Sequence, residues 1–327
     1  MTVSNKDKVK ELIKTKVSLA PMAGITDFMM RDLIRKYTKD SLLTTEMISS
    51  EFLRQVKGNV IEKKNEKSSP VSYQISGHKP QMMADAAKYL EQFADMIDIN
   101  MGCPVNKVVK GQDGCALMKN PQLATDIVKA IKEVINVPLS VKFRLGYTFE
   151  ELNYVEFGQK MQEAGADFIT IHGRTRSQMY SGNADWEKIR LLKDNVDVPV
   201  FANGDVNSIE TAEECLAKSK TDGVAIGRGT LGDLSLIYRI EHYFKTGEKL
   251  PLPTIEEKIE QAIAHLNYEI ELRGENTGIK FMRKFYPYYI SKIHQATKLR
   301  SKLMVSEDLK EIYEILNIIK QKKEPII

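Results

Sequence analysis

The sequence has few cysteines, no long apolar run and no glycine-rich dinucleotide fingerprint. Its three cysteines, an odd number without a CxxC pair, argue against a disulfide framework and a structural zinc site. No run approaches the roughly 18 apolar residues that a membrane span needs, and the opening MTVSNKDKVKELIKTK lacks the apolar stretch of a signal peptide. No GxGxxG motif follows a predicted strand, so no sequence motif indicates where a nicotinamide cofactor would bind. We therefore expect a cytoplasmic protein without disulfides, bound metal or membrane segment.

Length and composition indicate a soluble protein of more than one domain. At 327 residues the chain exceeds what one hydrophobic core usually supports, so we expect one large domain and a smaller one. The residues are 42% hydrophobic and 28% charged, as is typical of globular proteins. The net charge of +4 is too small to indicate a partner by itself, and nothing requires an obligate protein partner.

Short apolar runs alternate with helical patterns through most of the chain. The predicted strands are residues 17–21, 42–46, 71–75, 96–100, 138–142, 167–171, 198–202 and 222–226. The predicted helices between them include residues 27–37, 80–93, 121–135, 150–164, 186–193 and 208–218. Eight βα units predict a (β/α)8 TIM barrel, which usually takes about 250 residues. A doubly wound sheet is the alternative, and the count of eight favours the barrel.

The alternation divides the chain into three predicted parts. Residues 1–16 are polar and lysine-rich, and we expect a leader that the core does not need. Residues 17–250 would form the catalytic barrel. Residues 251–327 show only helical patterns and predict a small all-helical domain, with helices at 255–273, around 279–297 and at 307–322.

Polar residues gather where the predicted strands end, which is where barrels of this kind carry their functional groups. The last two ends, residues 203–205 (Asn-Gly-Asp) and 227–229 (Gly-Arg-Gly), supply glycines for close backbone approach and an arginine. These features predict a phosphate site, because backbone N–H groups after the last strands often hold phosphate. The alternative is that the glycines merely end strands and form turns.

Lys142 and His172 end two strands, and we expect them to line one cavity with Gln74 and Asn100. A buried ammonium is costly without an anionic partner. This combination of donors suits an electron-rich ring with polar edges, such as a flavin. The alternative for His172 is a structural histidine whose hydrogen bonds are satisfied within the protein.

Cys103 lies in a polar loop, between Gly102 and Pro104, just after the strand at 96–100. A free thiol with a pKa of about 8.5 is mostly protonated at neutral pH, so it can act as a general acid as well as a nucleophile. Cys115 and Cys215 lie in apolar surroundings, and we interpret both as structural.

The helical tail carries a basic, aromatic run from Lys280 to Lys302. It holds seven basic residues, five aromatic residues and no acidic residue. Basic side chains contact phosphates, and aromatic rings can stack on unpaired bases. The alternative is a solvated basic face above aromatic core contacts, and the run alone does not separate the two.

The strand-end motifs match a known family. They are LAPMAGITD (19–27), TEM (45–47), NMGCP (100–104), KFRLG (142–146), HGRTR (172–176), ADW (184–186), NGD (203–205) and GRG (227–229). With these motifs in this order, the chain resembles the tRNA-dihydrouridine synthases, most closely the bacterial B-type branch, over residues 17–289. It departs from the family pattern at 28–31 (FMMR), where Pro-Phe-Arg is usual, and at Phe285, where histidine is common.

The resemblance implies an FMN-dependent barrel followed by a helical tRNA-binding domain. NADPH would reduce the flavin, hydride would pass to C6 of a flipped-out uridine, and Cys103 would protonate C5 to give 5,6-dihydrouridine. The residues implied to bind FMN are Pro21, Met22, Ala23, Gln74, Lys142, His172, Asn203, Gly204, Asp205, Gly227 and Arg228. The residues implied to face substrate or RNA are Asn100, Arg174, Lys280, Arg283 and Lys284.

Two other functions stay open at this point. One is a flavin-dependent barrel that reduces a small molecule of the dihydroorotate or enoate type. The other is a non-redox RNA-binding protein on a barrel scaffold, which would leave the strand-end residues without a purpose.

Overall fold

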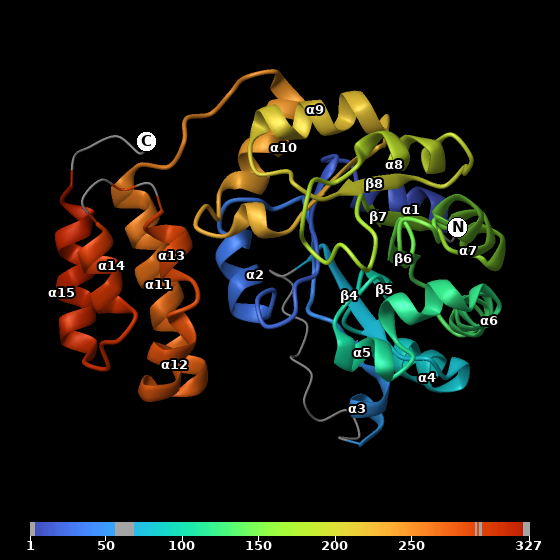
Figure 1. Cartoon of the computed structure of the whole chain (residues 1–327), viewed down its shortest axis with the longest axis horizontal. Coiled ribbons are helices and arrows are strands. Elements are labelled where there is room, and N and C mark those ends of the chain that lie inside the picture. Colours follow the sequence, from blue (N-terminus) through green and yellow to red (C-terminus); the bar gives the residue numbers. More distant parts are fainter. Residues whose placement is uncertain (1–3, 56–68, 292, 294–295, 323–327) are drawn as a thin grey trace. The chain divides into compact units, whose positions relative to one another are not determined.

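The computed structural model of the chain describes residues 4–55, 69–291, 293 and 296–322. Within these residues nine parallel strands form one sheet, and eight of them close into a barrel (Figure 1). The barrel strands are β1 (Val17–Leu19), β2 (Leu42–Thr44), β4 (Val71–Ser76), β5 (Met96–Met101), β6 (Leu139–Arg144), β7 (Phe168–His172), β8 (Val200–Asn203) and β9 (Gly223–Ile226). Each has a predicted counterpart, so the TIM-barrel prediction is confirmed and the doubly wound alternative is wrong.

The barrel closes because its first strand has neighbours on both sides. β1 pairs with β2 and, through Val17 opposite Val224, with β9. A short extra strand that we did not predict, β3 (Ile48–Ser49), pairs with the end of β4. Inside the barrel, alternate residues surround a small cavity whose lining includes Asp98, Ser140, Lys142 and Thr170.

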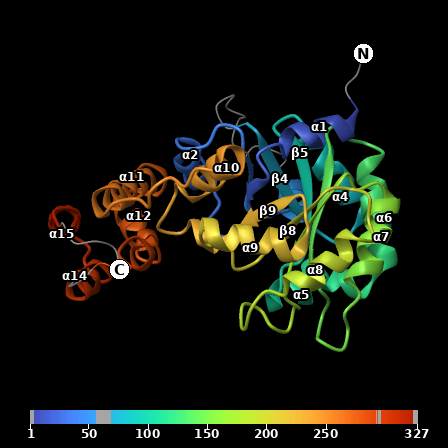
Figure 2. The same ribbon diagram turned by 90° about the horizontal axis from the view of Figure 1, so that it is seen from above.

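Helices cover the outside of these strands (Figures 1 and 2). They are α4 (Pro80–Leu90), α6 (Pro121–Lys132), α7 (Tyr154–Ala164), α8 (Trp186–Lys193) and α9 (Ile209–Ser219), with the shorter α3 (Ser50–Gln55), α5 (Asn106–Lys110) and η2 (Gly114–Lys119) in the loops. α6 illustrates the local cause. The Asn120 side chain accepts from Leu123 N, Pro121 fits the first turn, and Ala124, Ile127, Val128 and Ile131 form one buried stripe. No helix in the described ranges is long and apolar enough to cross a membrane.

The N-terminal segment is part of the core, contrary to expectation. It forms α1 (Asn5–Leu12), whose Val9 is 1% exposed. Val9 and Ile13 share one buried cluster with residues at which barrel strands begin, including Leu42, Met96 and Phe168. The expectation of a leader that the core does not need is therefore wrong for this helix. Lys6 and Lys10 of this helix are exposed and Lys8 is partly buried, whereas Val9 lies in the cluster and Leu12 packs against it.

The chain forms two compact units, Met1–Asp27 with Lys39–Gly227, and Phe28–Thr38 with Arg228–Ile327. The helical elements of the second unit are α2 (Phe28–Arg35), η3 (Arg228–Thr230), α10 (Leu236–Thr246), α11 (Ile255–Arg273), α12 (Glu275–Met282), α13 (Tyr286–Tyr289), α14 (Thr297–Leu303) and α15 (Leu309–Lys320). The observed bounds of α11 match the predicted helix at 255–273. The division into domains at 16/17 and 250/251 stays a prediction.

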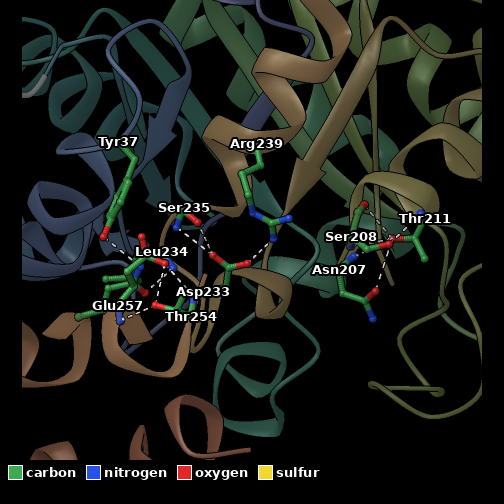
Figure 3. A network of polar contacts seen from close by, with 11 residues as sticks. Tyr37, Asn207, Ser208, Thr211, Asp233, Leu234, Ser235, Arg239, Thr254 and Glu257 are labelled. Carbon is green, nitrogen blue, oxygen red and sulfur yellow. Dashed lines mark hydrogen bonds and ion pairs between the residues drawn. The ribbon is translucent and has the colours of Figure 1, made fainter. Parts of the chain in front are cut away.

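Polar contacts join distant stretches of the second unit (Figure 3). Leu234 N donates to Gln261 Oε1 at 3.0 Å, and Gln261 Nε2 donates to the Tyr37 hydroxyl at 2.9 Å. Asp233 accepts from Ser235 Oγ at 2.7 Å. These bonds attach Tyr37, which follows α2, to α11, so residues 28–38 belong with a much later part of the chain.

The predicted helix around 279–297 is interrupted in the structure. α12 ends at Met282, and Pro287 lies in the first turn of the separate α13. Proline cannot donate a backbone hydrogen bond, and inside a helix its ring clashes with the carbonyl four residues earlier. The regular spacing of the aromatic residues in this stretch suggested one continuous helix, so the sequence did not reveal the interruption between α12 and α13.

Candidate functional site

The barrel brings the predicted strand-end residues together. Asn100 is the cross-strand neighbour of Lys142, and His172 is the neighbour of Asn203. Gln74 lies near the same end of β4, opposite Asp98. Because all strands are parallel, these side chains meet at the carboxyl end of the barrel, where function is expected.

Lys142 is the charged residue at the centre of this group. Its Nζ donates to Asn203 Oδ1 at 2.9 Å, and Asn203 Nδ2 donates to Ala225 O at 2.7 Å. The residue keeps some solvent contact, but protein surrounds its ammonium, and burial with help from the Arg144 charge lowers the pKa of Lys142 to about 8. The Asp98 carboxylate opposes that fall.

Asp98 is a site residue that sequence reasoning missed. It is 4% exposed and accepts from Gln74 Nε2 and Ser140 Oγ, both at 2.6 Å. Burial raises the pKa of Asp98, while these two hydrogen bonds and the Lys142 charge act in the opposite direction. The available signal was its position two residues before Asn100, which places both side chains on one face of β5.

The backbone of the Cys103 loop is held by one side chain and by a neighbouring backbone group. Cys103 N donates to Asn100 Oδ1 at 2.9 Å, and Cys103 O accepts from Cys115 N at 3.1 Å. Gly114 has φ +60, and a Cβ there would lie 2.8 Å from Cys103 O, so glycine lets the loop close. Burial raises the pKa of the Cys103 thiol, although Arg144 and Lys142 favour the thiolate. The thiol is therefore protonated at neutral pH.

The other two cysteines are fully buried, as expected of structural residues. Burial raises the pKa of Cys115 and of Cys215 to about 12. Neither thiol is poised to react, since the thiolate is the reactive form.

Two arginines tie the surrounding loops together. Arg144, which we did not single out from the sequence, donates to Gly102 O at 2.9 Å and to Met179 O at 2.8 Å. Arg174 is 2% exposed and binds both oxygens of Asp205, at 2.7 and 2.8 Å. These contacts give Arg144, Arg174 and Asp205 a role in shaping the loops. The substrate role of Arg174 and the cofactor role of Asp205 stay predictions.

Three other loops, which follow β1, β8 and β9, contribute to this end of the barrel. After β1, in the loop that holds Pro21 and Ala23, Met22 N donates to Thr26 Oγ1 at 3.0 Å. A Cβ added to Gly227 would lie 3.5 Å from Met22 Sδ, so the loops after β1 and β9 are adjacent. Gly204 has φ +121, and a Cβ there would lie 2.9 Å from His172 Cδ2. Arg228 begins η3 in the second unit.

The basic run of the tail combines exposed charges with core aromatics. Phe285, Tyr286 and Tyr289 are buried, so base stacking by these three is wrong, whereas Tyr288 is 41% exposed. The buried rings have neighbours in the same unit, since the His265 and Phe285 ring centroids are 4.4 Å apart. The predicted alternative of aromatic core contacts therefore holds for most of the run.

The three predicted RNA contacts of this run have partners within the second unit. Lys280 and Arg283 each approach Glu307, a residue just beyond the run, at 3.4 Å. Lys284 Nζ lies 3.5 Å from the centroid of the Phe281 ring. Lys292, another basic residue of the run, lies outside the described residues.

A closed parallel barrel that gathers a loop cysteine, a partly buried lysine and several amides at its strand ends defines a TIM-barrel enzyme. The particular family follows from the sequence: residues 18–324 match the dihydrouridine synthase (Dus) family, and the chain belongs to it.

Curated relatives are similar over nearly the whole chain. A probable tRNA-dihydrouridine synthase 1 of Synechocystis sp. is 40% identical over 93% of this chain and 86% of that protein. A tRNA-dihydrouridine synthase B of Shewanella oneidensis is 39% identical over 86% of this chain and 88% of that protein. The resemblance to the B-type branch is confirmed.

Among solved structures, a 2-naphthoyl-CoA reductase in complex with 2-naphthoyl-CoA is similar with a TM-score of 0.52. It is 12% identical and covers 70% of this chain and 50% of that chain. At this identity the likeness concerns the fold alone.

Proposed function

We propose that this protein is an FMN-dependent tRNA-dihydrouridine synthase that uses NADPH as reductant. The observation that carries the proposal is the place of Cys103, on the loop after β5 and bonded to the strand-end residue Asn100, in a chain that belongs to this family. Burial raises the pKa of its thiol, which favours the form that can donate a proton. The similar proteins of Synechocystis and Shewanella bear this activity in their names.

The donor set at the strand ends fits a flavin. The Lys142 ammonium donates to a neutral amide oxygen, and its lowered pKa reflects burial and the Arg144 charge, which together outweigh the Asp98 carboxylate. An electron-rich ring edge would supply further counter-charge. Gln74 would also hydrogen-bond the ring edge, and His172 would lie near the ring. Asn203, Gly204, Asp205, Gly227 and Arg228 would hold the phosphate side.

When bound, reduced FMN supplies the hydride for C6 of the uracil, and the chain supplies the rest. The Cys103 thiol would give its proton to C5, so that hydride and proton together saturate the C5–C6 double bond. Lys142 and Arg144 favour the thiolate that this transfer leaves, because their charges lower the pKa of Cys103. Water would then restore the thiol.

The tRNA would be bound by the helical region at 251–327. Lys280, Arg283 and Lys284 are its proposed phosphate contacts, and they would contribute affinity without reading sequence. Extruding a uridine costs a few kcal/mol, which such contacts can offset.

The first experiment follows the visible spectrum of the purified protein. A flavin band that bleaches with NADPH and recovers on addition of unmodified tRNA is expected. A colourless protein after reconstitution with FMN, or a reduced flavin that tRNA does not reoxidise, would overturn the proposal.

A cysteine variant isolates the proton donor. Cys103→Ala should keep bound flavin and NADPH oxidation but lose most dihydrouridine formation, and Cys215→Ala, a buried cysteine of α9, is the matched control. A fully active Cys103→Ala would rule out the acid role.

Affinity for tRNA should fall as salt rises, by roughly 0.7–0.9 log units per log unit of salt for each phosphate contact.

A further inference from the structure

A chain of side-chain hydrogen bonds links the barrel interior to the Cys103 loop. Gln74 Nε2 donates to Asp98 Oδ2 at 2.6 Å, and Asn100 Nδ2 donates to Gln74 Oε1 at 2.8 Å. Asn100 Oδ1 then accepts from the backbone N–H groups of Gly102, at 3.2 Å, and of Cys103, at 2.9 Å. Two amide side chains thus stand between a buried carboxylate and the loop. We call this set of side chains, Asp98, Gln74 and Asn100, the relay.

The Asp98 carboxylate fixes which group donates and which accepts in every hydrogen bond of the relay. An ionised carboxylate can only accept, so Gln74 must turn its NH₂ group toward Asp98 and its oxygen toward Asn100. Asn100 must then donate to Gln74 and keep its own oxygen for the loop. Burial raises the pKa of Asp98, while the Ser140 hydroxyl, which donates to its other oxygen, the Gln74 amide and the Lys142 charge all favour the ionised form.

The three side chains of the relay are almost fully buried, so water cannot easily replace a hydrogen bond that one of them loses. Gln74 is 0%, Asp98 4% and Asn100 9% exposed. Reversing one amide would set oxygen against oxygen or nitrogen against nitrogen at each junction. Buried polar groups without partners are costly, so one end of the relay controls the other.

We propose that Asp98 is a positioning residue, which holds the Cys103 loop through Gln74 and Asn100. The proposal uses the proposed function only in treating Cys103 as the reacting group, and the relay itself rests on the distances above.

A residue swap tests the direction of the relay. In Gln74→Glu two carboxylates face each other, and the bond between positions 74 and 98 is lost. In Asp98→Asn the carboxylate no longer fixes which way the Gln74 amide turns. The double variant, Gln74→Glu with Asp98→Asn, places the carboxylate at position 74 and the amide at position 98. The Asn at 98 can then donate to the Glu at 74, and this Glu still accepts from Asn100. Ser140 keeps an acceptor at 98 in every variant.

The readout is hydrogen exchange of the Gly102 and Cys103 amides in the full chain, without NADPH or tRNA. We expect Gln74→Glu to speed their exchange by about tenfold or more, Asp98→Asn to speed it less, and the double variant to return within about threefold of wild type, since contacting residues couple. The amides of Ile97 and Ile99 in β5 are the internal control and should not change.

The outcomes separate a positioning role from a packing role. Restored protection in the double variant supports the relay, even if a single variant is too unstable to measure. A double variant that exchanges as fast as Gln74→Glu, or does not fold, overturns it, as do unchanged amides in all three. The test does not depend on activity: a fully active Cys103→Ala would remove the acid assignment and leave this result standing.

Discussion

Replacing Lys142 with methionine should stabilise the protein while weakening its proposed cofactor site. The pKa of Lys142 falls from an ordinary 10.5 to about 8 in the folded chain. At about 1.4 kcal/mol for each pH unit, folding with a charged Lys142 costs up to about 3 kcal/mol at neutral pH. Solvent contact and the lost bond to Asn203 reduce the expected net gain to about 1–2 kcal/mol.

The pH dependence gives the sign of the effect. Between pH 8 and 10.5 the unfolded chain holds the Lys142 proton more tightly than the folded chain, so this residue makes stability rise with pH in that window. Below about pH 8 both states are protonated and the full cost is present. The advantage of Lys142→Met should therefore be largest below pH 8 and shrink as pH rises toward 10.5.

The assay is denaturant unfolding of flavin-free wild type and variant between pH 6.5 and 10. The control is Lys129→Met, at an exposed position of α6. Flavin must be absent because a ligand that binds only the folded state stabilises wild type selectively. A variant that is less stable at every pH, or a difference that does not vary with pH, would refute the reasoning. In parallel, FMN titration should give weaker binding to Lys142→Met than to the control.

Two further substitutions test the scaffold around the site. Val9→Ala should lower the free energy of unfolding by about 1–3 kcal/mol, because Val9 is buried in the barrel cluster, and denaturant melts should show almost no loss for the exposed Lys10→Ala. Gly204→Ala should cost about 2–4 kcal/mol, since its φ is +121 and the new Cβ would lie 2.6 Å from that of Ala184. Gly247→Ala, with φ +77 and nothing within 4 Å, should cost only about 1 kcal/mol, and equal losses at both glycines would contradict the clash.

The regular part of the fold was predictable from the sequence because its signals are local. Strand and helix periodicity gave all eight barrel strands to within a few residues, and the bounds of α8 and α11 match their predictions. The motif order indicated the family, which the match over residues 18–324 confirms.

The features that the sequence did not predict depend on contacts between residues that are far apart in the chain. Val9 and Ile13 become core residues only because α1 folds against strands that are remote in the sequence. Asp98 and Arg144 were overlooked because their partners lie on neighbouring strands and loops, so their roles appear only when the barrel closes. Burial of Phe285, Tyr286 and Tyr289 likewise depends on packing inside the second unit. The roles of the site residues toward FMN and tRNA stay predictions.

The pairing of β1 with β9 has a consequence for the order in which the protein can fold. Val17 lies opposite Val224, so the first strand has only one of its two neighbours until nearly the whole barrel has been synthesised. During that interval β1 presents an unpaired edge, and the face that α1 covers is incomplete. Pairing of this sequence separation is slow because loop closure must precede it. A ribosome-bound chain that ends before residue 223 should therefore be open to strand exchange with other chains and in need of protection by chaperones.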